Sequence, residues 1–260
     1  MSETVSHEPL AGIRLWDPWS PKPADGIRLH AVHPSRPGKR FPLARSSSGV
    51  HTLHSIPHLD HAPEFLPTAL VVELDDPSRQ VLPVRLEPAL PCDGIWSDIG
   101  TAFSGIAPAG SVPLFAHPCR QAPAGWVRLR ASLRLGSSNV AVPWAVMEVR
   151  HGSRLVAAGL SSPTGEVVAA FAPPAPARRP IGLPASEEFD TRSWSFDVIF
   201  RWSSDRLTDS VPALAALASQ PAVAVQADVP DKFKTLRCGP GETILSSGPR
   251  PGSSTVILQA

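Results

Sequence analysis

Four histidines in one short segment, His51, His54, His58 and His61, form the densest group of potential metal ligands in the chain. Neutral imidazoles bind zinc, nickel or copper where their ring nitrogens converge. His51 and His54 fall on an expected strand, and their odd spacing places them on opposite faces of it. Pro57 then prevents a helix from aligning His58 and His61. We therefore expect surface or loop histidines and no metal cofactor, and keep a metal-dependent hydrolase as an alternative hypothesis.

Motifs for covalent or phosphate chemistry are absent from the sequence, including Gly-x-Ser-x-Gly, the P-loop, Gly-x-Gly-x-x-Gly and His-Glu-x-x-His. The three cysteines, Cys92, Cys119 and Cys238, are odd in number and show no Cys-x-x-Cys spacing, which argues against a disulfide framework or a zinc knuckle. The acidic pairs Asp75-Asp76 and Glu187-Glu188 lie in expected turns and are interpreted as solvated charges. The sequence thus predicts a protein that is not an enzyme.

Seven tryptophans occur without any tyrosine. Trp16, Trp19 and Trp96 lie outside strong strand patterns, and exposed tryptophans of this kind bind sugar rings in some proteins. For Trp16 and Trp19 we favour a proline-tryptophan plug over the end of a β-sandwich, because large aromatic residues often cap small cores. The other four are expected in strands as core residues: Trp126, Trp144, Trp194 and Trp202.

Composition limits the function classes. The 260 residues include 24 basic and 23 acidic side chains, so the formal net charge of +1 gives no field that attracts nucleic acid or an anionic membrane. No stretch approaches the roughly 20 apolar residues of a membrane-spanning helix. The first ten residues contain no apolar run, so we expect no signal peptide and synthesis in the cytoplasm.

Proline and glycine divide the chain into short apolar blocks. There are 31 prolines and 18 glycines, and proline is costly inside helices but tolerated at strand ends and turns. Residues 126–173 alternate between apolar and polar side chains, with glycine, serine and proline between the runs, as is typical of short antiparallel strands. One short helix is expected at 211–219, with Asp209 or Ser210 as its cap.

The two halves of the sequence repeat a similar order. With no gap, Pro18, Pro23, Ala24, Arg28, Leu29 and Ala31 align with Pro118, Pro123, Ala124, Arg128, Leu129 and Ala131. Each half then has a polar turn ending in glycine, a strand that stops at proline, and a longer strand: 46–57 and 69–74 in the first half, 161–173 and 193–202 in the second. The sequence predicts an N-terminal sandwich at 1–91 with a loose arm, a linker at 92–113 and a second sandwich at 114–260.

The turn at Ser162-Pro-Thr-Gly165 and its neighbouring strands carry a resemblance. Segments 127–131, 142–150 and 158–174 resemble the prealbumin-like, or carboxypeptidase regulatory-like, type of β-sandwich, and 49–57 is similar to the matching segment of the first half. The turn lacks the Asp and Arg of the family pattern. The resemblance implies a mainly β protein with two tandem Ig-like or prealbumin-like antiparallel sandwiches.

Other motifs point to a biological context. They are a proline-tryptophan start, Arg40-Phe-Pro-Leu-Ala-Arg45, Trp144-Ala-Val-x-Glu-Val149 and Leu236-Arg-Cys-Gly-x-Gly-Glu-Thr243. Their order resembles that of structural proteins of phage-tail-like contractile injection systems. This resemblance implies a baseplate or tail-associated component of a large particle, with other protein subunits as partners and no catalytic residues.

The favoured hypothesis is therefore an assembly protein that contacts neighbouring subunits through strand edges and proline-rich loops, without nucleic-acid binding or membrane insertion. The long loop 178–188 is the main candidate contact, through Arg178, Arg179, Glu187 and Glu188. The alternative is a carbohydrate-binding or adhesion module that uses exposed tryptophans such as Trp16 and Trp19.

Overall fold

The computed structural model describes residues 11–20, 24, 26–33, 36–54, 71–87, 103–136, 139–174, 194–204, 211–227, 232–233, 236–239, 241–246 and 255–259. The chain divides into two compact units. Unit 1 contains residues 1–114 and 206–219, and unit 2 contains residues 115–205 and 220–260. The boundaries predicted from the sequence were at 91 and 114. They assigned 206–219 to the second domain, whereas this segment belongs to unit 1. The described residues are mainly β, with one short helix, as predicted.

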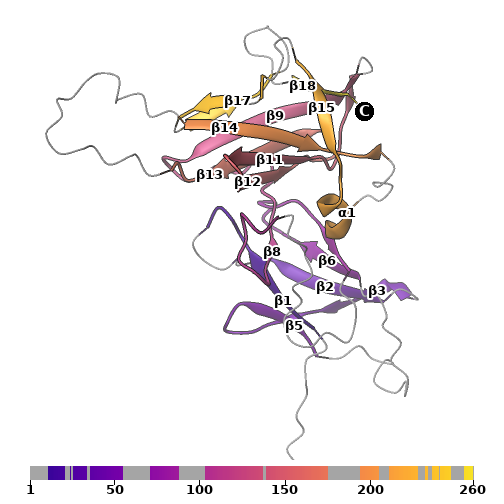
Figure 1. The fold of residues 1–260 in the computed structure, drawn as a ribbon. Helices are drawn as coiled ribbons and strands as arrows, with labels where there is room; N and C mark the ends of the chain where they lie inside the picture. Colours follow the sequence, from indigo (N-terminus) through magenta and orange to yellow (C-terminus); the bar gives the residue numbers. More distant parts are fainter. Residues whose placement is uncertain are drawn as a thin grey trace, which may run out of the picture. The chain divides into compact units, whose positions relative to one another are not determined.

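Unit 1 contains two four-stranded sheets (Figure 1). The first has the order β4-β5-β1-β8, with β1 at Ala11–Trp16, β4 at Ala44–Arg45, β5 at Val50–Leu53 and β8 at Val112–Pro113. The second has the order β3-β2-β6-β7, with β2 at Arg28–His33, β3 at Arg36–Pro42, β6 at Val71–Asp75 and β7 at Arg85–Leu86. Alternate residues of the strands form an apolar core, because side chains along a strand point to opposite faces. Its buried members include Ile13, Leu15, Leu29, Ala31, Val72 and Leu74.

The helix α1, Leu214–Ala218, belongs to unit 1 and is shorter than the expected 211–219. The amide of Arg85 donates to the carbonyl of Pro212 (2.8 Å), and Arg85 forms a parallel β-bridge with Ala213. This extended backbone delays the start of the helix. The N-cap is consequently Ala213, without a side-chain hydrogen bond, and the expected cap at Asp209 or Ser210 is wrong. Leu214 and Leu217 are buried and anchor the helix.

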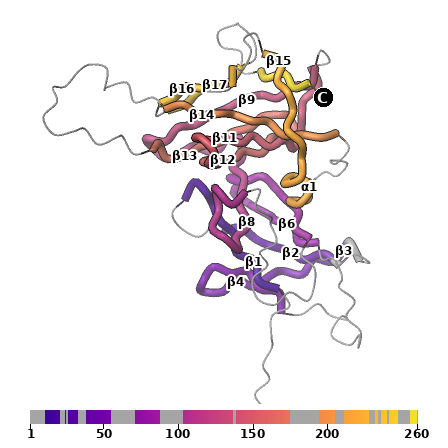
Figure 2. Tube along the Cα trace, viewed as in Figure 1, coloured from indigo at the N-terminus to yellow at the C-terminus, as the bar shows by residue number. Residues whose placement is uncertain are grey.

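Unit 2 is a larger sandwich whose sheets are joined into one ten-stranded network. Its central strands are β9 (Val127–Leu135), β11 (Val146–His151), β12 (Arg154–Leu160), β13 (Glu166–Phe171) and β14 (Trp194–Arg201). The others are β10 (Val140–Ala141), β15 (Ala222–Gln226), β16 (Leu236–Cys238), β17 (Gly241–Ile244) and β18 (Thr255–Gln259). The C-terminal strands complete the network. β17 and β18 pair in parallel with successive halves of β9, and β18 also pairs with β15. β15 and β16 in turn pair with β14 (Figure 2).

The central strands of the two units share one topology. In unit 1, β1 pairs with β5, and β2 pairs with β3 and β6. In unit 2, β9 pairs with β13, and β11 pairs with β12 and β14. By these pairings, β1, β2, β3, β5 and β6 correspond to β9, β11, β12, β13 and β14.

The residue alignment proposed for this repeat is wrong, however. It placed Arg28 to Ala31 on Arg128 to Ala131, but the first segment lies in β2 and the second in β9, which have different positions in the shared topology. The Arg-Leu-x-Ala pattern describes any strand with alternating buried residues, so it does not identify which strand it is. A similar turn precedes both segments: Ser20 donates to the carbonyl of Asp17 and Arg120 to that of His117.

Two turns, one before β5 and one before β13, are bonded alike. The Ser46 amide donates to the Val50 carbonyl (2.8 Å) and the Ser162 amide to the Glu166 carbonyl (2.8 Å). Each serine hydroxyl accepts from the amide four residues later and bonds the hydroxyl two residues later, Ser48 in one turn and Thr164 in the other. The glycines that close the turns, at 49 and 165, have φ values of 78° and 81°. Glycine takes this conformation at low cost, which is why both turns end in it.

Among the described residues, no helix has the length and apolar character needed to cross a membrane.

Candidate functional site

His51 lies within β5, and His54 directly follows the strand with its ring on the side of Thr52, away from the face of His51, as predicted. His51 is 2% exposed and lies directly across from Ile13 of β1 and Arg45 of β4. Neither ring nitrogen of His51 has a hydrogen-bond partner. His54 is exposed, and its Nε2 lies 3.0 Å from the hydroxyl of Thr52. These two imidazoles therefore do not converge.

The remaining histidines of the group, His58 and His61, lie outside the described residues. Within the described part of the chain, no group of three or more histidine, cysteine or acidic side chains is placed to hold a metal ion. Burial lowers the pKa of His51 below its ordinary value of 6.5, and the positive charge of Arg45 lowers this pKa further.

Trp16 and Trp19 differ in exposure. Trp19 is 5% exposed, and its amide donates to Oδ1 of Asp17 (3.0 Å) in the turn after β1. The ring is therefore buried, as a plug over the core would be, and is not available to stack on a sugar. Trp16 is half-buried at the end of β1, where it pairs with Pro113. Trp96 lies outside the described residues, as do Arg178, Arg179, Glu187 and Glu188.

The tryptophans of unit 2 are at or beyond strand ends. Trp144 and Trp202 are buried, and Trp202 donates from its indole nitrogen to the carbonyl of Pro143 (3.1 Å). The expected strand positions are wrong for Trp126, Trp144 and Trp202, and Trp126 and Trp194 are half-buried and not in the core. Trp144 adopts a φ of 59° in the turn before β11. A positive φ is uncommon for a large residue, and the surrounding bonds hold it. Its amide donates to Ser161 and its carbonyl accepts from the buried Gln220.

A buried carboxylate joins two strands of unit 2. The side chain of Glu148, on β11, is 4% exposed and binds Arg201 of β14 through Oε1. Its other oxygen, Oε2, accepts from Nη2 of Arg150 at 2.9 Å and from Nε at 3.1 Å. Arg201 also donates to the carbonyl of Gln220 (3.3 Å). With both oxygens engaged by guanidinium groups, Glu148 is a structural cross-link between strands.

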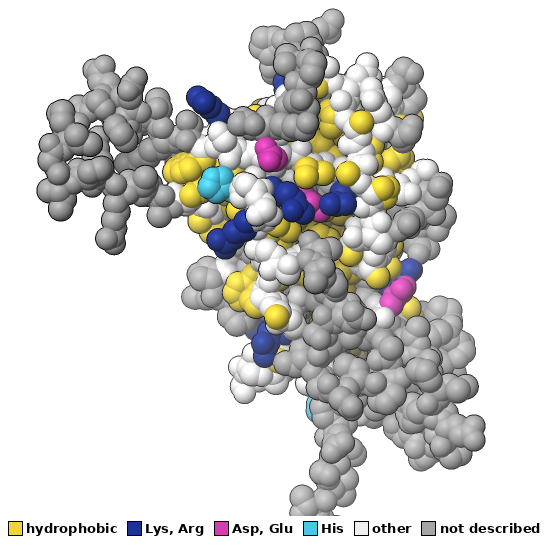
Figure 3. All heavy atoms as spheres, in the orientation of Figure 1, with side chains coloured by type: hydrophobic (Ala, Val, Ile, Leu, Met, Phe, Trp, Pro, Cys, Tyr) yellow, Lys and Arg dark blue, Asp and Glu magenta, His cyan; other side chains and the backbone are white. Residues whose placement is uncertain are grey.

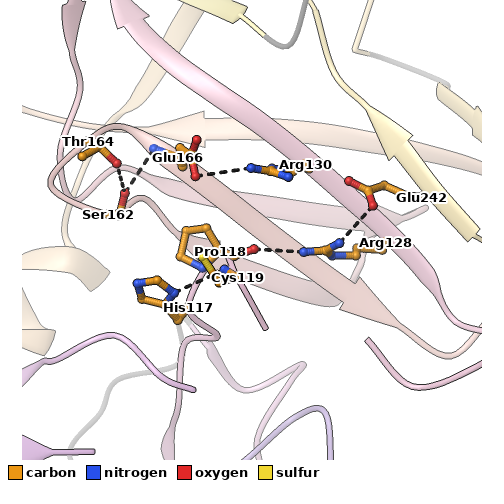
Figure 4. Close-up of polar contacts among 9 residues, drawn as sticks. All are labelled: His117, Pro118, Cys119, Arg128, Arg130, Ser162, Thr164, Glu166 and Glu242. Carbon is orange, nitrogen blue, oxygen red and sulfur yellow. Dashed lines mark hydrogen bonds and ion pairs between the residues drawn. The ribbon is translucent and has the colours of Figure 1, made fainter. Parts of the chain in front are cut away.

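A second set of ion pairs crosses the outer face of β9 (Figure 4). Arg128 binds Glu242 of β17 (2.9 Å) and donates to the carbonyl of Pro118 (2.9 Å). Arg130 binds Glu166 of β13 (3.4 Å). The Arg128 side chain is 10% exposed, whereas the side chains of Arg130 and Glu166 are 38% and 40% exposed. These contacts tie β9 to the strands on either side of it.

The close-up also shows the turn at His117, Pro118 and Cys119 (Figure 4). The Cys119 amide donates to Nδ1 of His117 (3.2 Å), so this imidazole nitrogen stabilises the turn. Cys119 is a free, exposed thiol. Cys238 is free and buried, and burial raises its pKa to about 11. Cys92 lies outside the described residues.

Asp76 has a more specific role than the solvated charge expected from the sequence. Its carboxylate accepts the amides of Ser78, Gln80 and Val81 and the hydroxyl of Ser78, at 2.6 to 2.9 Å. Burial raises its pKa, but the hydrogen bonds from Ser78 and from these amides outweigh burial and leave the pKa below its ordinary value. The carboxylate thereby organises the loop between β6 and β7.

The face shown in Figure 3 has basic and acidic side chains next to one another, interspersed with apolar surface. This distribution agrees with the near-balance of charge in the sequence. The ion pairs were not predicted from the sequence, although the glutamate inside the apolar run of Trp144 to Val149 indicates a buried, partnered carboxylate.

The described residues define a mainly β protein built from two sandwich units of the same central topology, with buried ion pairs between strands. Among solved structures, the chain is similar to the Bacillus anthracis TIE protein, with 8% identity and a TM-score of 0.25. That match covers 72% of this chain and 27% of the TIE chain, and it carries no argument about function. No protein-family model matches the chain, and no curated protein matches it.

Proposed function

We propose that the protein is a non-enzymatic structural component of a phage-tail-like contractile injection particle, where it binds neighbouring subunits. The observation that carries the proposal concerns the glutamates in two of the motifs that resemble such proteins. Glu148 binds Arg201, and Glu242 binds Arg128, so each joins neighbouring strands. Motif residues that stabilise a β framework are what a structural component requires, since its role depends on shape and not on a reactive side chain.

The strand edge that supports this role best is β3. It is the terminal strand of its sheet, where it pairs with β2. Gly38, Lys39 and Arg40 are exposed along it. A terminal strand presents backbone donors and acceptors to another chain, and strand addition of this kind needs no side-chain chemistry. Pro42 limits the length of edge that a partner strand can use, because proline has no amide hydrogen.

Proline-rich loops supply the second part of the proposed interface. The segment with Arg178, Arg179, Glu187 and Glu188 lies outside the described residues, and its role is proposed from the sequence. Its mixture of both charge signs suits recognition of a partner with complementary charges, which favours correct pairing and fast association.

The test is cosedimentation with the particle. Extracts of cells that make the protein are fractionated by sedimentation, and the protein is followed by mass spectrometry together with tail and sheath proteins. We expect it in the particle fraction at a constant ratio to those proteins. Its consistent absence from particles that are otherwise complete would overturn the proposal.

A pair of variants tests the β3 edge separately. The amide of Leu43 donates to Leu29 of β2, so by alternation along the strand the amide of Arg40 points to the free edge. Arg40→Pro removes that amide, whereas Arg40→Ala removes only the side chain. We expect Arg40→Pro to reduce incorporation into particles and Arg40→Ala to leave it unchanged, with both variants melting near the same temperature. Equal incorporation of the two variants would show that β3 is not the contact, without affecting the wider proposal.

A further inference from the structure

His51 occupies an apolar core position of unit 1. It pairs across β1 with Ile13, whose side chain is 0% exposed, and so shares the face that points into the sandwich. Both imidazole nitrogens are buried without a hydrogen-bond partner. Leaving buried polar atoms without hydrogen-bond partners is unfavourable, so this histidine weakens the core even when it is neutral.

The core position of His51 has an equivalent in unit 2. The matched turns align Ser46 with Ser162 and Val50 with Glu166, so His51 corresponds to Val167. Val167 of β13 is 0% exposed and pairs with Ala131 of β9. The same core position thus contains valine in one unit and an ionisable residue in the other.

The charged surroundings of His51 oppose its protonation. Arg45 lies directly across from it on β4, and Ile13 lies across from it on β1. The core-facing residues of the opposite sheet, among the described strands, are apolar: Leu29, Ala31, Val72 and Leu74. The carboxylate of Asp17, after β1, accepts the amide of Trp19, and Asp75 and Asp76 are at the end of β6 and directly after it. Burial is the larger cause that lowers the pKa of His51, and the positive charge of Arg45 is the second.

We propose that β5 is an acid-sensitive element of unit 1, in which protonation of His51 puts a positive charge into the core beside Arg45 and releases β5 from β1. The direction follows from proton linkage. The unfolded chain binds a proton near pH 6.5, whereas the folded unit binds it only at lower pH. Stability is therefore complete above pH 6.5 and declines as the pH falls from 6.5 towards the folded-state pKa. Each unit of difference between the two pKa values lowers the folding equilibrium constant about tenfold.

Hydrogen exchange on the full chain tests this inference, with the second unit as an internal control. Protection factors, corrected for intrinsic exchange, are compared for 50–53 and for 166–171 at about pH 7.5 and about pH 5. We expect β5 to lose protection at the lower pH and β13 to keep it. Equal behaviour of the two strands would overturn the proposal.

His51→Val introduces the residue that unit 2 has at this position, and we expect it to abolish the acid-dependent loss of protection in β5. His54→Gln, on the exposed face of the same segment, is the matched control and is expected to behave as wild type. Acid sensitivity that persists in a folded His51→Val protein would contradict the proposal. If that variant does not fold, Arg45→Gln at an exposed position decides: it removes one cause of the lowered pKa of His51, so the loss of protection at about pH 5 is expected to become smaller, and an unchanged profile would overturn the proposal.

Discussion

Ser46 and Ser162 occupy the same position in two similar turns, and the hydroxyl of each accepts a hydrogen bond from the amide four residues later. Ser46 belongs to unit 1 and Ser162 to unit 2. In both turns the hydroxyl also bonds a second hydroxyl at 2.8 Å, so the side chain fixes the turn at two points. The bond to the main chain is the shorter in the Ser46 turn, 3.2 Å against 3.3 Å, but Ser162 is the more buried residue.

Replacing Ser162 with alanine is expected to destabilise the protein by about 0.5 to 1.5 kcal/mol, because the part-buried amide of Glu166 loses its hydrogen bond. Ser46→Ala is expected to cost less, since Ser46 is half-buried and water can replace part of the lost bond. Urea unfolding at equilibrium measures both values.

Ser47→Ala is the control for this pair, because Ser47 is exposed in the same turn as Ser46. Its stability is expected within about 0.5 kcal/mol of the wild type. An effect of Ser47→Ala as large as that of Ser162→Ala would show that the hydroxyl bonds do not stabilise these turns.

Gly159 of β12 has no room for a side chain. An added Cβ would lie 2.3 Å from the carbonyl oxygen of Val168, which is a backbone atom of β13 and cannot rotate away. Gly159→Ala is therefore expected to lower stability by about 1 to 3 kcal/mol or more, as overpacking does. The measurement is the midpoint of thermal unfolding, and Gly38→Ala, with no atom within 4 Å of the added Cβ, should change it little. A Gly159→Ala protein that melts at the wild-type temperature would contradict the close approach of the two strands.

The sequence predicted those parts of the fold that local chemistry determines. A glycine at positive φ followed by a strand that stops at proline identified both turns and the strands after them, because the turn conformation and the strand end each depend on a few neighbouring residues. β1 was not predicted, since residues on both of its faces are buried and it lacks clear alternation. The start of α1 was also missed, because it depends on the bridge between Ala213 and Arg85, residues far apart in the sequence.

In the candidate site, too, features set by neighbouring residues were predictable and those set by distant residues were not. The odd spacing of His51 and His54 was enough to predict their opposite faces. The partner of Glu148 could not be predicted in this way, because Arg201 lies 53 residues further along the chain and meets it only through the pairing of β11 with β14. Burial of Trp19 likewise depends on packing that the sequence does not display.

Glu148→Gln is expected to destabilise unit 2 by about 3 to 5 kcal/mol, since it leaves two guanidinium groups without their counter-charge beside a buried amide. The side chain of Glu148 is 4% exposed, so salt should screen this interaction weakly. Urea unfolding at low and high ionic strength measures both the magnitude and the salt dependence.

The matched control is Glu73→Gln in unit 1. Glu73 binds Arg40 at 2.8 Å, but the two side chains are 36% and 61% exposed. Exposed pairs of this kind contribute about 1 kcal/mol or less. Similar losses of stability for the two variants would show that burial does not strengthen the Glu148 cross-link.

The thiols of Cys119 and Cys238 are expected to react at very different rates. Cys119 is exposed, whereas Cys238 is buried and burial raises its pKa to about 11, so few Cys238 thiolates form near neutral pH. Alkylation with iodoacetamide at about pH 8, followed by peptide mass spectrometry, should modify Cys119 in the native protein and Cys238 only after addition of urea. The Cys92 peptide is measured separately and does not affect the comparison. Modification of Cys238 in native protein at the rate of Cys119 would mean that β16 is not held against β14 as the pairing of Trp194 with Cys238 requires.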